Sequence, residues 1–159
     1  MYWKVAMLSL SQNRKKMCTV TYIPQAEGGF ILTSNRDESP ARATRNLDRN
    51  QRNGQQLVFP RDAGAGGTWI ALSDADRVVC LLNGAFTQHK HQPPYKKSRG
   101  IMVLEFFDHA NVSAFAKNYD FQGMEPFTMI VLESQDLRVL RWDEAQLHDE
   151  QLKPTGHYI

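Results

Sequence analysis

The sequence predicts an α+β domain in which antiparallel strands form sheets and helices pack against them. Short runs rich in β-branched and aromatic residues alternate with turn residues over residues 18–83 and again over 127–142. Between them, residues 101–119 carry apolar side chains at helical spacing. The predicted order is therefore four strands, two helices and at least two further strands, which is typical of layered domains.

The first two predicted strands are residues 18–23 (CTVTYI) and 30–34 (FILTS). Pro24 ends the first strand, and Gly28-Gly29 can adopt the turn conformations that a hairpin return requires. We therefore expect the two strands to be antiparallel neighbours in one sheet.

The next segment, residues 39–66, is polar and rich in Pro and Gly, and we expect an irregular excursion around one short strand at residues 57–59. Residues 68–73 and 77–83 are nearly unbroken apolar runs, which predicts strands in a sheet covered on both faces. Residues 84–100 form a long polar loop, and loops of this length in compact domains tend to be functional or mobile.

Two helices are predicted next, over residues 101–109 and 111–119, with Asn111 as the N-cap of the second. Residues 127–133 (FTMIVLE) and 137–142 (LRVLRW) then form another predicted hairpin.

Length and net charge limit what kind of protein this is. At 159 residues the chain fits one domain, and a formal net charge of +2 is too small to indicate a nucleic-acid partner. The basic clusters at residues 14–16 and 96–99 are short, and we interpret them as solvated loops.

The two cysteines and the first residues of the chain indicate the cellular compartment. Cys18 and Cys80 carry no sign of a secreted disulfide scaffold, so we expect free thiols in a reducing cytoplasm. In residues 1–16 the apolar run precedes the charges, the reverse of a signal peptide, and it is too short to span a membrane.

Cys18 follows Met17 at the head of the first predicted strand. A buried strand cysteine is one interpretation, since free Cys behaves as a small hydrophobe. In the other interpretation, translation begins at Met17, and removal of this methionine leaves Cys18 as the first residue. Its α-amine can then act as the base for its own thiol. Cys80 lies inside an apolar run, and we expect it in the core.

A polar cluster, Asn35, Arg36, Asp37 and Glu38, ends the second predicted strand. Arg36 could give a thiolate its electropositive setting, and the Asp37 carboxylate could orient the α-amine. A polar strand exit with a turn-forming Asp is the alternative for each of these residues.

Asn83 ends the strand over residues 77–83 and precedes Gly84, so its amide could donate to a developing oxyanion or simply enter a turn. Gly66-Gly67 precede Trp69, and they could admit a substrate or another backbone, or form a tight turn.

His89 and His91 lie two residues apart in the Pro-rich loop. No Cys or acidic ligand is close to them in the sequence, so we expect no metal site.

Four motifs in this order resemble the NRDE family, which includes the transport and Golgi organisation proteins of animals and many bacterial members. They are residues 17–20 (MCTV), 33–38 (TSNRDE), 65–70 (AGGTWI) and 81–83 (LLN). Residues 83–86 (NGAF) and 95–100 (YKKSRG) look like the bacterial branch.

That family is similar to N-terminal nucleophile hydrolases of the bile-salt hydrolase and penicillin V acylase type. The resemblance implies a four-layer αββα sandwich of antiparallel sheets and amide cleavage by an N-terminal cysteine. By position it implies Cys18 as the nucleophile, Asp37 as the amine-orienting residue and Asn83 as the oxyanion amide. Ser34 stands where those hydrolases have an arginine, which leaves the substrate class open.

The resemblance also gives the expected domain organisation. Residues 1–16 have no counterpart, so we expect a disordered extension or a mis-assigned start. Residues 17–159 would form the N-terminal portion of a single NRDE-family domain, because the family continues further, and the fold would be incomplete at its C-terminus.

The function implied is a cysteine N-terminal nucleophile amidohydrolase acting on a small-molecule amide, with Asn35, Arg36, Gly67 and Trp69 binding the substrate. The alternative is a non-catalytic binding or trafficking protein for haem, acyl-CoA or a similar amphipathic ligand. A third interpretation makes Cys18 part of the core. No cofactor is expected, and the sequence does not indicate an oligomeric state.

Overall fold

The structure is a computed structural model, and it describes residues 4–7, 18–36, 44, 46–87 and 89–159 of the chain. Its elements in chain order are β1 (Lys4–Met7), β2 (Thr19–Pro24), β3 (Phe30–Asn35), β4 (Leu47–Arg52), β5 (Gln55–Pro60), β6 (Ile70–Ser73), β7 (Arg77–Asn83), α1 (Arg99–Glu105), the 3₁₀ turn η2 (Phe106–Asp108), α2 (Val112–Asn118), β8 (Phe127–Glu133), β9 (Asp136–Trp142) and β10 (Leu147–Leu152).

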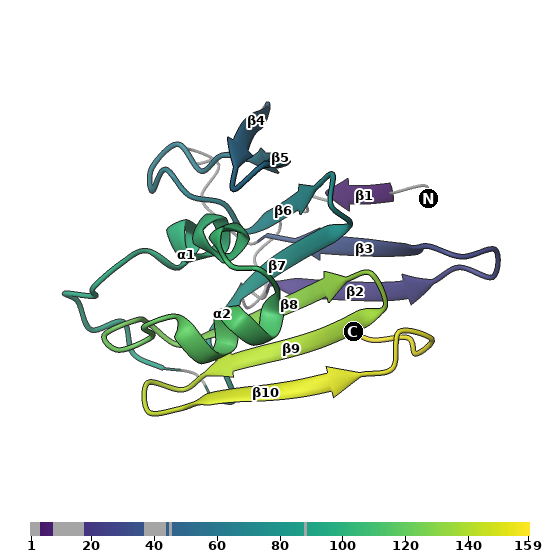
Figure 1. The fold of residues 1–159 in the computed structure, drawn as a ribbon. Helices are drawn as coiled ribbons and strands as arrows, with labels where there is room; N and C mark the ends of the chain where they lie inside the picture. The colour runs from purple at the N-terminus through teal and green to yellow at the C-terminus, as the bar shows by residue number, and fades with distance from the viewer. Residues whose placement is uncertain (1–3, 8–17, 37–43, 45, 88) are drawn as a thin grey trace, which may run out of the picture.

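The strands form two sheets, as Figure 1 shows. The larger sheet has seven strands in the order β10-β9-β8-β7-β6-β5-β4, and every neighbouring pair is antiparallel. The smaller sheet has the order β1-β3-β2, with β2 and β3 antiparallel as predicted. The α+β class with facing antiparallel sheets is therefore confirmed, apart from the parallel pairing of β1 with β3.

The large sheet is the middle layer, because both of its faces are covered. On one face the helical segment packs Phe106, Phe107 and Phe115 against strand residues such as Val79 and Met129. On the other face β2 and β3 contribute a second core cluster whose buried members are Val20, Tyr22, Phe30, Leu32, Ile70, Val78, Cys80, Leu132 and Leu137. Covered on both faces, β7 needs the unbroken apolar run that its sequence shows.

Between residues 39 and 66 the sequence interpretation was wrong where the structure describes the chain. Instead of one short strand in an irregular segment, β4 and β5 form a full hairpin paired from Leu47↔Pro60 to Arg52↔Gln55. Its turn is Asn53-Gly54, with φ of 47° and 77°. Asn-Gly is the strongest two-residue hairpin signal, because both central positions need positive φ.

Residues Lys4–Met7 form β1, inside the extension that we expected to be disordered. They pair with β3 in the register Lys4↔Ile31 to Met7↔Ser34. The physical reason is that the outer side of β3 would otherwise present unpaired backbone groups, and an edge of this kind accepts a further strand.

The two helices are shorter than predicted. α1 ends at Glu105 and continues as a 3₁₀ turn, whereas the sequence predicted a helix over residues 101–109. Asn111 is the N-cap of α2 as predicted, because its Oδ1 accepts a hydrogen bond of 2.8 Å from the Ala114 N–H.

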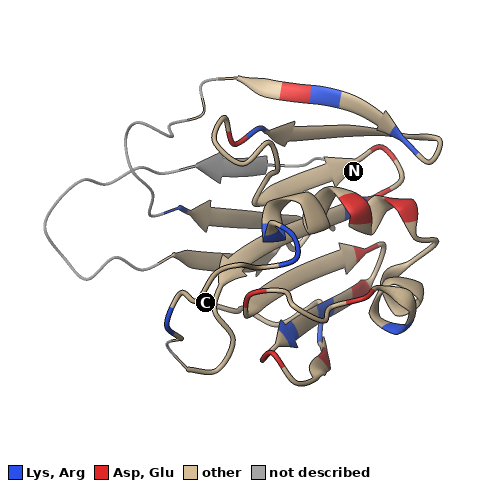
Figure 2. Cartoon of the chain, turned by 90° about the vertical axis from the view of Figure 1, so that its left-hand side faces the viewer, with Lys and Arg blue, Asp and Glu red and all other residues tan. Residues whose placement is uncertain are grey.

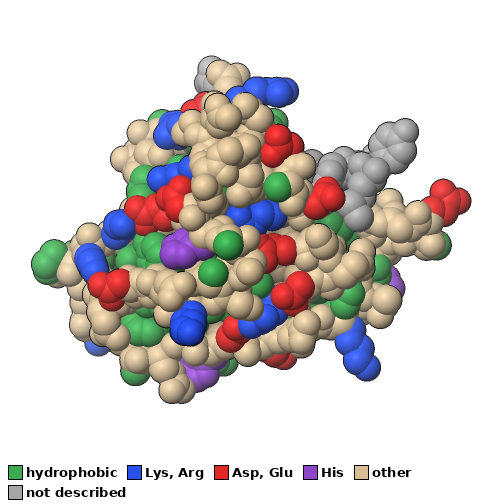
Figure 3. Space-filling model, in the orientation of Figure 1, with side chains coloured by type: hydrophobic (Ala, Val, Ile, Leu, Met, Phe, Trp, Pro, Cys, Tyr) green, Lys and Arg blue, Asp and Glu red, His purple; other side chains and the backbone are tan. Residues whose placement is uncertain are grey.

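Charged residues lie on the edge strand β4, on the helical segment, within strands such as β9 and β10, and in loops, as Figure 2 shows in part. On the helical face in Figure 3, acidic and basic side chains are interspersed. Within the described residues, no helix has both the length and the apolar character that crossing a membrane requires.

Candidate functional site

A pocket of about 550 Å³ opens where the ends of β3 and β7 meet the segment that leads into α1. It is lined by residues around the start of β2 and the end of β3 (Cys18, Ser34, Asn35, Arg36), by residues before β6 (Asp62, Ala65, Gly67, Thr68, Trp69), by Leu81 and Asn83 of β7, and by His91, residues 95–100 and Glu125. Its volume is in the range that small-molecule sites occupy.

Cys18 lies directly before β2 and is half-buried at the pocket wall. The register Thr19↔Asn35 places it beside the end of β3, so the thiol comes next to Asn35 and Arg36. Connectivity alone produces this neighbourhood, since a short hairpin brings the start of one strand beside the end of the next.

Cys80 differs from Cys18 in its burial. It is fully buried in the core between the two sheets, and burial raises the pKa of its thiol to about 12. The prediction that Cys80 belongs to the core is confirmed.

Arg36 is held on two sides. Its Nη2 forms an ion pair with Asp62 Oδ2, and its guanidinium lies 4.3 Å from the centroid of the Trp69 ring. Asp62 is buried, and its Oδ1 accepts hydrogen bonds from the N–H groups of Gly64 and Ala65 at 2.9 and 3.1 Å. The loop before β6 therefore holds the Asp62 carboxylate in place, and this carboxylate in turn orients Arg36.

Sequence reasoning missed Asp62. The signal was present in Arg61-Asp62-Ala63-Gly64, because an Asp followed by small residues tends to bond the backbone two residues on. An Asp that closes such a turn becomes rigid and can then anchor a cation.

Gly67 lines the pocket, but its close neighbour is another backbone. A Cβ atom on Gly67 would lie 2.3 Å from the carbonyl carbon of Gly100, and the Thr68 N–H donates to Gly100 O at 3.0 Å. Of the alternatives at this glycine, close approach of another backbone is the one that the fold uses.

Asn83 is the exposed last residue of β7 and lines the same pocket as Cys18. The chain after it is fixed, because the Gly84 N–H donates to Pro126 O at 3.0 Å and Thr128 Oγ1 donates to Gly84 O at 2.9 Å. Gly84 has a φ of 85°, a conformation that suits glycine.

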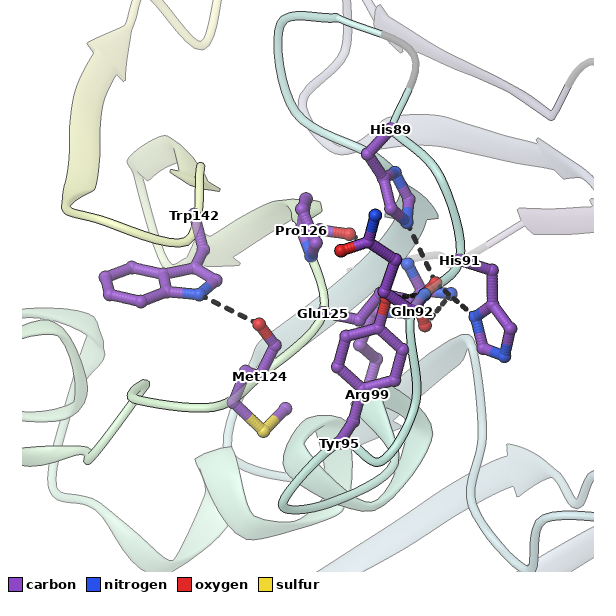
Figure 4. A network of polar contacts seen from close by, with 9 residues as sticks. All are labelled: His89, His91, Gln92, Tyr95, Arg99, Met124, Glu125, Pro126 and Trp142. Atoms are coloured by element: carbon purple, nitrogen blue, oxygen red, sulfur yellow. Dashed lines mark hydrogen bonds and ion pairs between the residues drawn. The ribbon is translucent and has the colours of Figure 1, made fainter.

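Glu125 is the centre of a polar network at the pocket (Figure 4). Its Oε1 contacts His89 Nε2 at 2.8 Å and His91 Nδ1 at 2.9 Å, and its Oε2 pairs with Arg99 Nη2 at 2.9 Å. Burial by itself raises the pKa of Glu125, but the two histidine hydrogen bonds and the Arg99 charge outweigh it and leave the pKa lowered.

In the sequence, no acidic residue is close to His89 or His91. The fold nevertheless brings Glu125 to both of them from a distant part of the chain. Even so, the described residues contain no group of three or more His, Cys, Asp or Glu side chains arranged to hold a metal ion.

The structure brings most of the predicted site residues to one pocket: Cys18, Asn35, Arg36, Gly67, Trp69 and Asn83. Asp37 lies outside the described residues. The 84–100 loop contributes His91 and residues 95–100 to the lining. The catalytic and binding roles of these residues stay predictions.

Comparison with known families gives one result. The model of the family described as Transport and Golgi organisation 2 matches residues 17–159. A comparison with curated proteins found no match. The family match begins at Met17, the residue immediately before the thiol.

Proposed function

Because the chain belongs to the Transport and Golgi organisation 2 family, which confirms the resemblance seen in its motifs, we propose that it is a cysteine-dependent amidohydrolase for small-molecule amides. The observation that carries this proposal is the pocket shared by Cys18 and Asn83. A nucleophile and an amide donor at one small-molecule cavity are the minimum that acyl transfer needs.

The reaction proceeds in two steps. The Cys18 thiolate attacks the amide carbonyl carbon, the Asn83 amide donates to the oxyanion, and the protonated amine leaves as the carbon–nitrogen bond breaks. Water then attacks the thioester, releasing the carboxylic acid and restoring the thiol. In a chain that begins at Cys18, the α-amine takes the thiol proton and returns it to the leaving amine.

The positions around Cys18 support binding of a small polar substrate. Arg36 is oriented by Asp62 and Trp69, and Asn35 adjoins it at the end of β3. In this proposal Asp37 orients the α-amine, and Asn35, Arg36 and Trp69 contact the substrate. A reducing cytoplasm suits the reaction, since it keeps Cys18 as a free thiol.

The alternative is a binding or trafficking protein for haem, acyl-CoA or a similar amphipathic ligand, without turnover. The pocket wall favours it in one respect: Lys96, Lys97 and Arg99 line the pocket together with the aromatic Trp69. Such a wall can bind an anionic group next to an apolar one.

The deciding experiment measures thiol-dependent hydrolysis. Protein made from its natural gene is examined by intact-mass analysis for a start at Cys18, then incubated with a panel of N-acyl amides. We expect an acyl adduct on Cys18, and turnover that Cys18→Ala abolishes and Cys80→Ala retains. Hydrolysis that survives Cys18→Ala would refute the proposal, and tight ligand binding without any adduct would establish the binding protein.

A further inference from the structure

Arg99 lies in the pocket wall at the first position of α1, with only 14% of its side chain exposed. The sequence interpretation placed it in a solvated basic cluster over residues 96–99, and for Arg99 that interpretation is wrong. A largely covered guanidinium is costly unless it is paired and hydrogen-bonded. Arg99 meets this condition, because Nη2 pairs with Glu125 and Nη1 donates to Pro126 O at 2.8 Å.

Glu125 is fixed by these contacts and by its neighbours along the chain. Arg99 holds its Oε2 and also donates to the carbonyl of the next residue, Pro126. The carbonyl of the preceding residue, Met124, accepts a 3.2 Å hydrogen bond from Trp142 Nε1. The side chain of Glu125 is only 12% exposed, and its other oxygen, Oε1, faces the two histidines in Figure 4. A carboxylate held in this way can orient the groups that bind it.

His89 and His91 bind Glu125 as hydrogen-bond donors. His89 Nε2 lies 2.8 Å and His91 Nδ1 lies 2.9 Å from the same oxygen, Oε1. Although burial by itself raises the pKa of Glu125, the histidine hydrogen bonds and the Arg99 charge leave this pKa lowered, so the carboxylate is ionised at neutral pH. An ionised carboxylate has no proton to give and only accepts hydrogen bonds. Each of these two ring nitrogens therefore carries a proton.

In His91, a proton on Nδ1 leaves Nε2 as the basic nitrogen of the neutral ring. Nε2 lies on the side of the ring away from Glu125 (Figure 4), and within the described residues it has no hydrogen-bond partner. The ring lines the pocket and packs against Tyr95, with 5.3 Å between the two ring centroids. Because 68% of the His91 side chain is exposed, a ligand or a water molecule in the pocket can reach the ring.

His89 makes the same hydrogen bond from a different place. Its side chain is 21% exposed, and the described lining of the pocket contains His91 but not His89. The second ring nitrogen of His89, Nδ1, faces Gly84, since it lies 3.9 Å from the position that a Cβ atom would take there. Two histidines thus share one carboxylate oxygen, and His89 is the matched control for His91.

We infer that His91 is the proton acceptor of the pocket, with Nε2 as the accepting atom, and that Glu125 is the positioning residue that fixes its tautomer. A carboxylate that binds Nδ1–H and leaves Nε2 free is the arrangement that prepares an imidazole for general base catalysis. Within the described lining His91 is the single imidazole, whereas the carboxylates of Asp62 and Glu125 are both engaged in ion pairs.

The use of this acceptor rests on the proposed function. In a chain that contains β1, Cys18 is not the first residue and has no free α-amine, so hydrolysis of the thioester needs another base. Cys18 and His91 line the same pocket, and a base acts either directly or through one intervening water. The water oxygen attacks the thioester carbon while Nε2 takes a proton from that water. The carbon–sulfur bond then breaks, the carboxylic acid leaves, and the sulfur takes the proton back from Nε2.

The tautomer is measured by nitrogen-15 NMR of the full chain labelled at histidine, at about pH 8, above the range in which histidine ordinarily titrates. The His91 signals are those that disappear in His91→Gln. We expect the proton on Nδ1 in the parent. In Glu125→Gln the amide oxygen should turn to Arg99 and the amide NH₂ to the histidines, which moves the His91 proton to Nε2. A parent ring protonated at Nε2, or a tautomer that Glu125→Gln leaves unchanged, would overturn the inference.

Proton transfer is measured with p-nitrophenyl acetate, which acetylates the Cys18 thiol without any amide substrate. Peptide mass mapping then follows the loss of the acetyl group from Cys18. We expect His91→Gln to slow this loss about a hundredfold, as removal of a general base does, and Glu125→Gln to slow it less. His89→Gln removes one hydrogen bond from the same oxygen and should leave the rate near that of the parent.

Each result of the second measurement has a distinct meaning. Equal slowing in His89→Gln and His91→Gln would assign both histidines to the structure of the loop and overturn the inference, as would an unchanged rate in His91→Gln. Amide hydrolysis that His91→Gln leaves intact would support the proposed function and refute the inference. Loss of the acetyl group that depends on His91, in a protein that hydrolyses no amide, would refute the proposed function and leave the inference standing.

Discussion

Gly67 and Gly100 approach each other backbone to backbone, so that a Cβ atom on Gly67 would lie 2.3 Å from the carbonyl carbon of Gly100. The contact joins the loop before β6 to the start of α1, and both segments line the pocket. No side chain fits between them, because real Cβ atoms essentially never approach other atoms that closely.

Gly67→Ala should therefore destabilise the protein by about 2 kcal/mol or more, because the added methyl meets backbone that cannot rotate away. Urea denaturation measures this change. Gly28→Ala is the matched control, because Gly28 has a φ of 87° with nothing within 4 Å of an added Cβ. The control should lose only about 1 kcal/mol from backbone strain. Equal losses in the two variants would contradict the role of the Gly67–Gly100 contact.

The Arg36–Asp62 pair gives the second prediction. The side chains of Arg36 and Asp62 are 18% and 7% exposed, so Asp62→Asn removes a charge that pairs with a largely covered arginine. Breaking such a pair from one side costs about 3 kcal/mol in free energy of unfolding.

The control for Asp62→Asn is Asp48→Asn, which breaks the pair between Asp48 and Arg61, whose side chains are 37% and 42% exposed. Exposed pairs contribute about 1 kcal/mol or less, so the control should unfold near the parent urea concentration. A loss in Asp62→Asn no larger than in the control would show that the loop, and not the carboxylate, orients Arg36.

The sequence could predict only the part of this site that depends on residues close to one another along the chain. The strands β2 and β3 were predicted to be antiparallel neighbours because a short hairpin joins them, and the register confirms that pairing, which brings Cys18 beside Asn35. Asp62, Arg99 and Glu125 reach the pocket through pairings between segments distant in sequence. Nothing local to Glu125 shows that it will meet Arg99 and two histidines.

In the fold, too, the elements that depend on local sequence could be predicted, whereas those that depend on distant segments could not. The strands around Cys80 and the N-cap at Asn111 were predictable because they depend on local pattern and local hydrogen bonds. The hairpin at Asn53-Gly54 was also predictable but was overlooked, since the flanking strand β4 has the polar sequence LDRNQR. β1 could not be predicted, because a strand at a sheet edge is determined by its partner.

The third prediction concerns acid stability. The pKa of Glu125 in the folded protein is lowered, although burial alone would raise it, because His89, His91 and Arg99 favour its charged form. A lowered carboxyl pKa adds stability above the unfolded value of about 4.3, and this stability is lost as pH falls through the folded pKa. Glu125→Gln should therefore lose less stability than the parent between about pH 5 and pH 3.

Urea denaturation at a series of pH values measures this difference. Glu150→Gln is the control for removing one carboxylate, since Glu150 is 55% exposed and pairs with Arg141 at the surface. Solvent screens this exposed pair, so the control should differ less from the parent than Glu125→Gln does. A parent-like loss in Glu125→Gln would show that the network around Glu125 contributes nothing to acid stability.

The last prediction tests the oxyanion role of Asn83. Its backbone ends β7 next to a fixed residue, because the backbone of Gly84 is bonded to both Pro126 and Thr128. An oxyanion donor acts mainly in the transition state, so in the proposed reaction Asn83→Ala should lower amide hydrolysis by about 10²–10³ in kcat with little change in KM. Asn50→Ala, on the exposed edge strand β4, should retain parent activity. A rise in KM with kcat unchanged would instead assign Asn83 to ground-state binding, because a donor used equally in both states does not accelerate the chemical step.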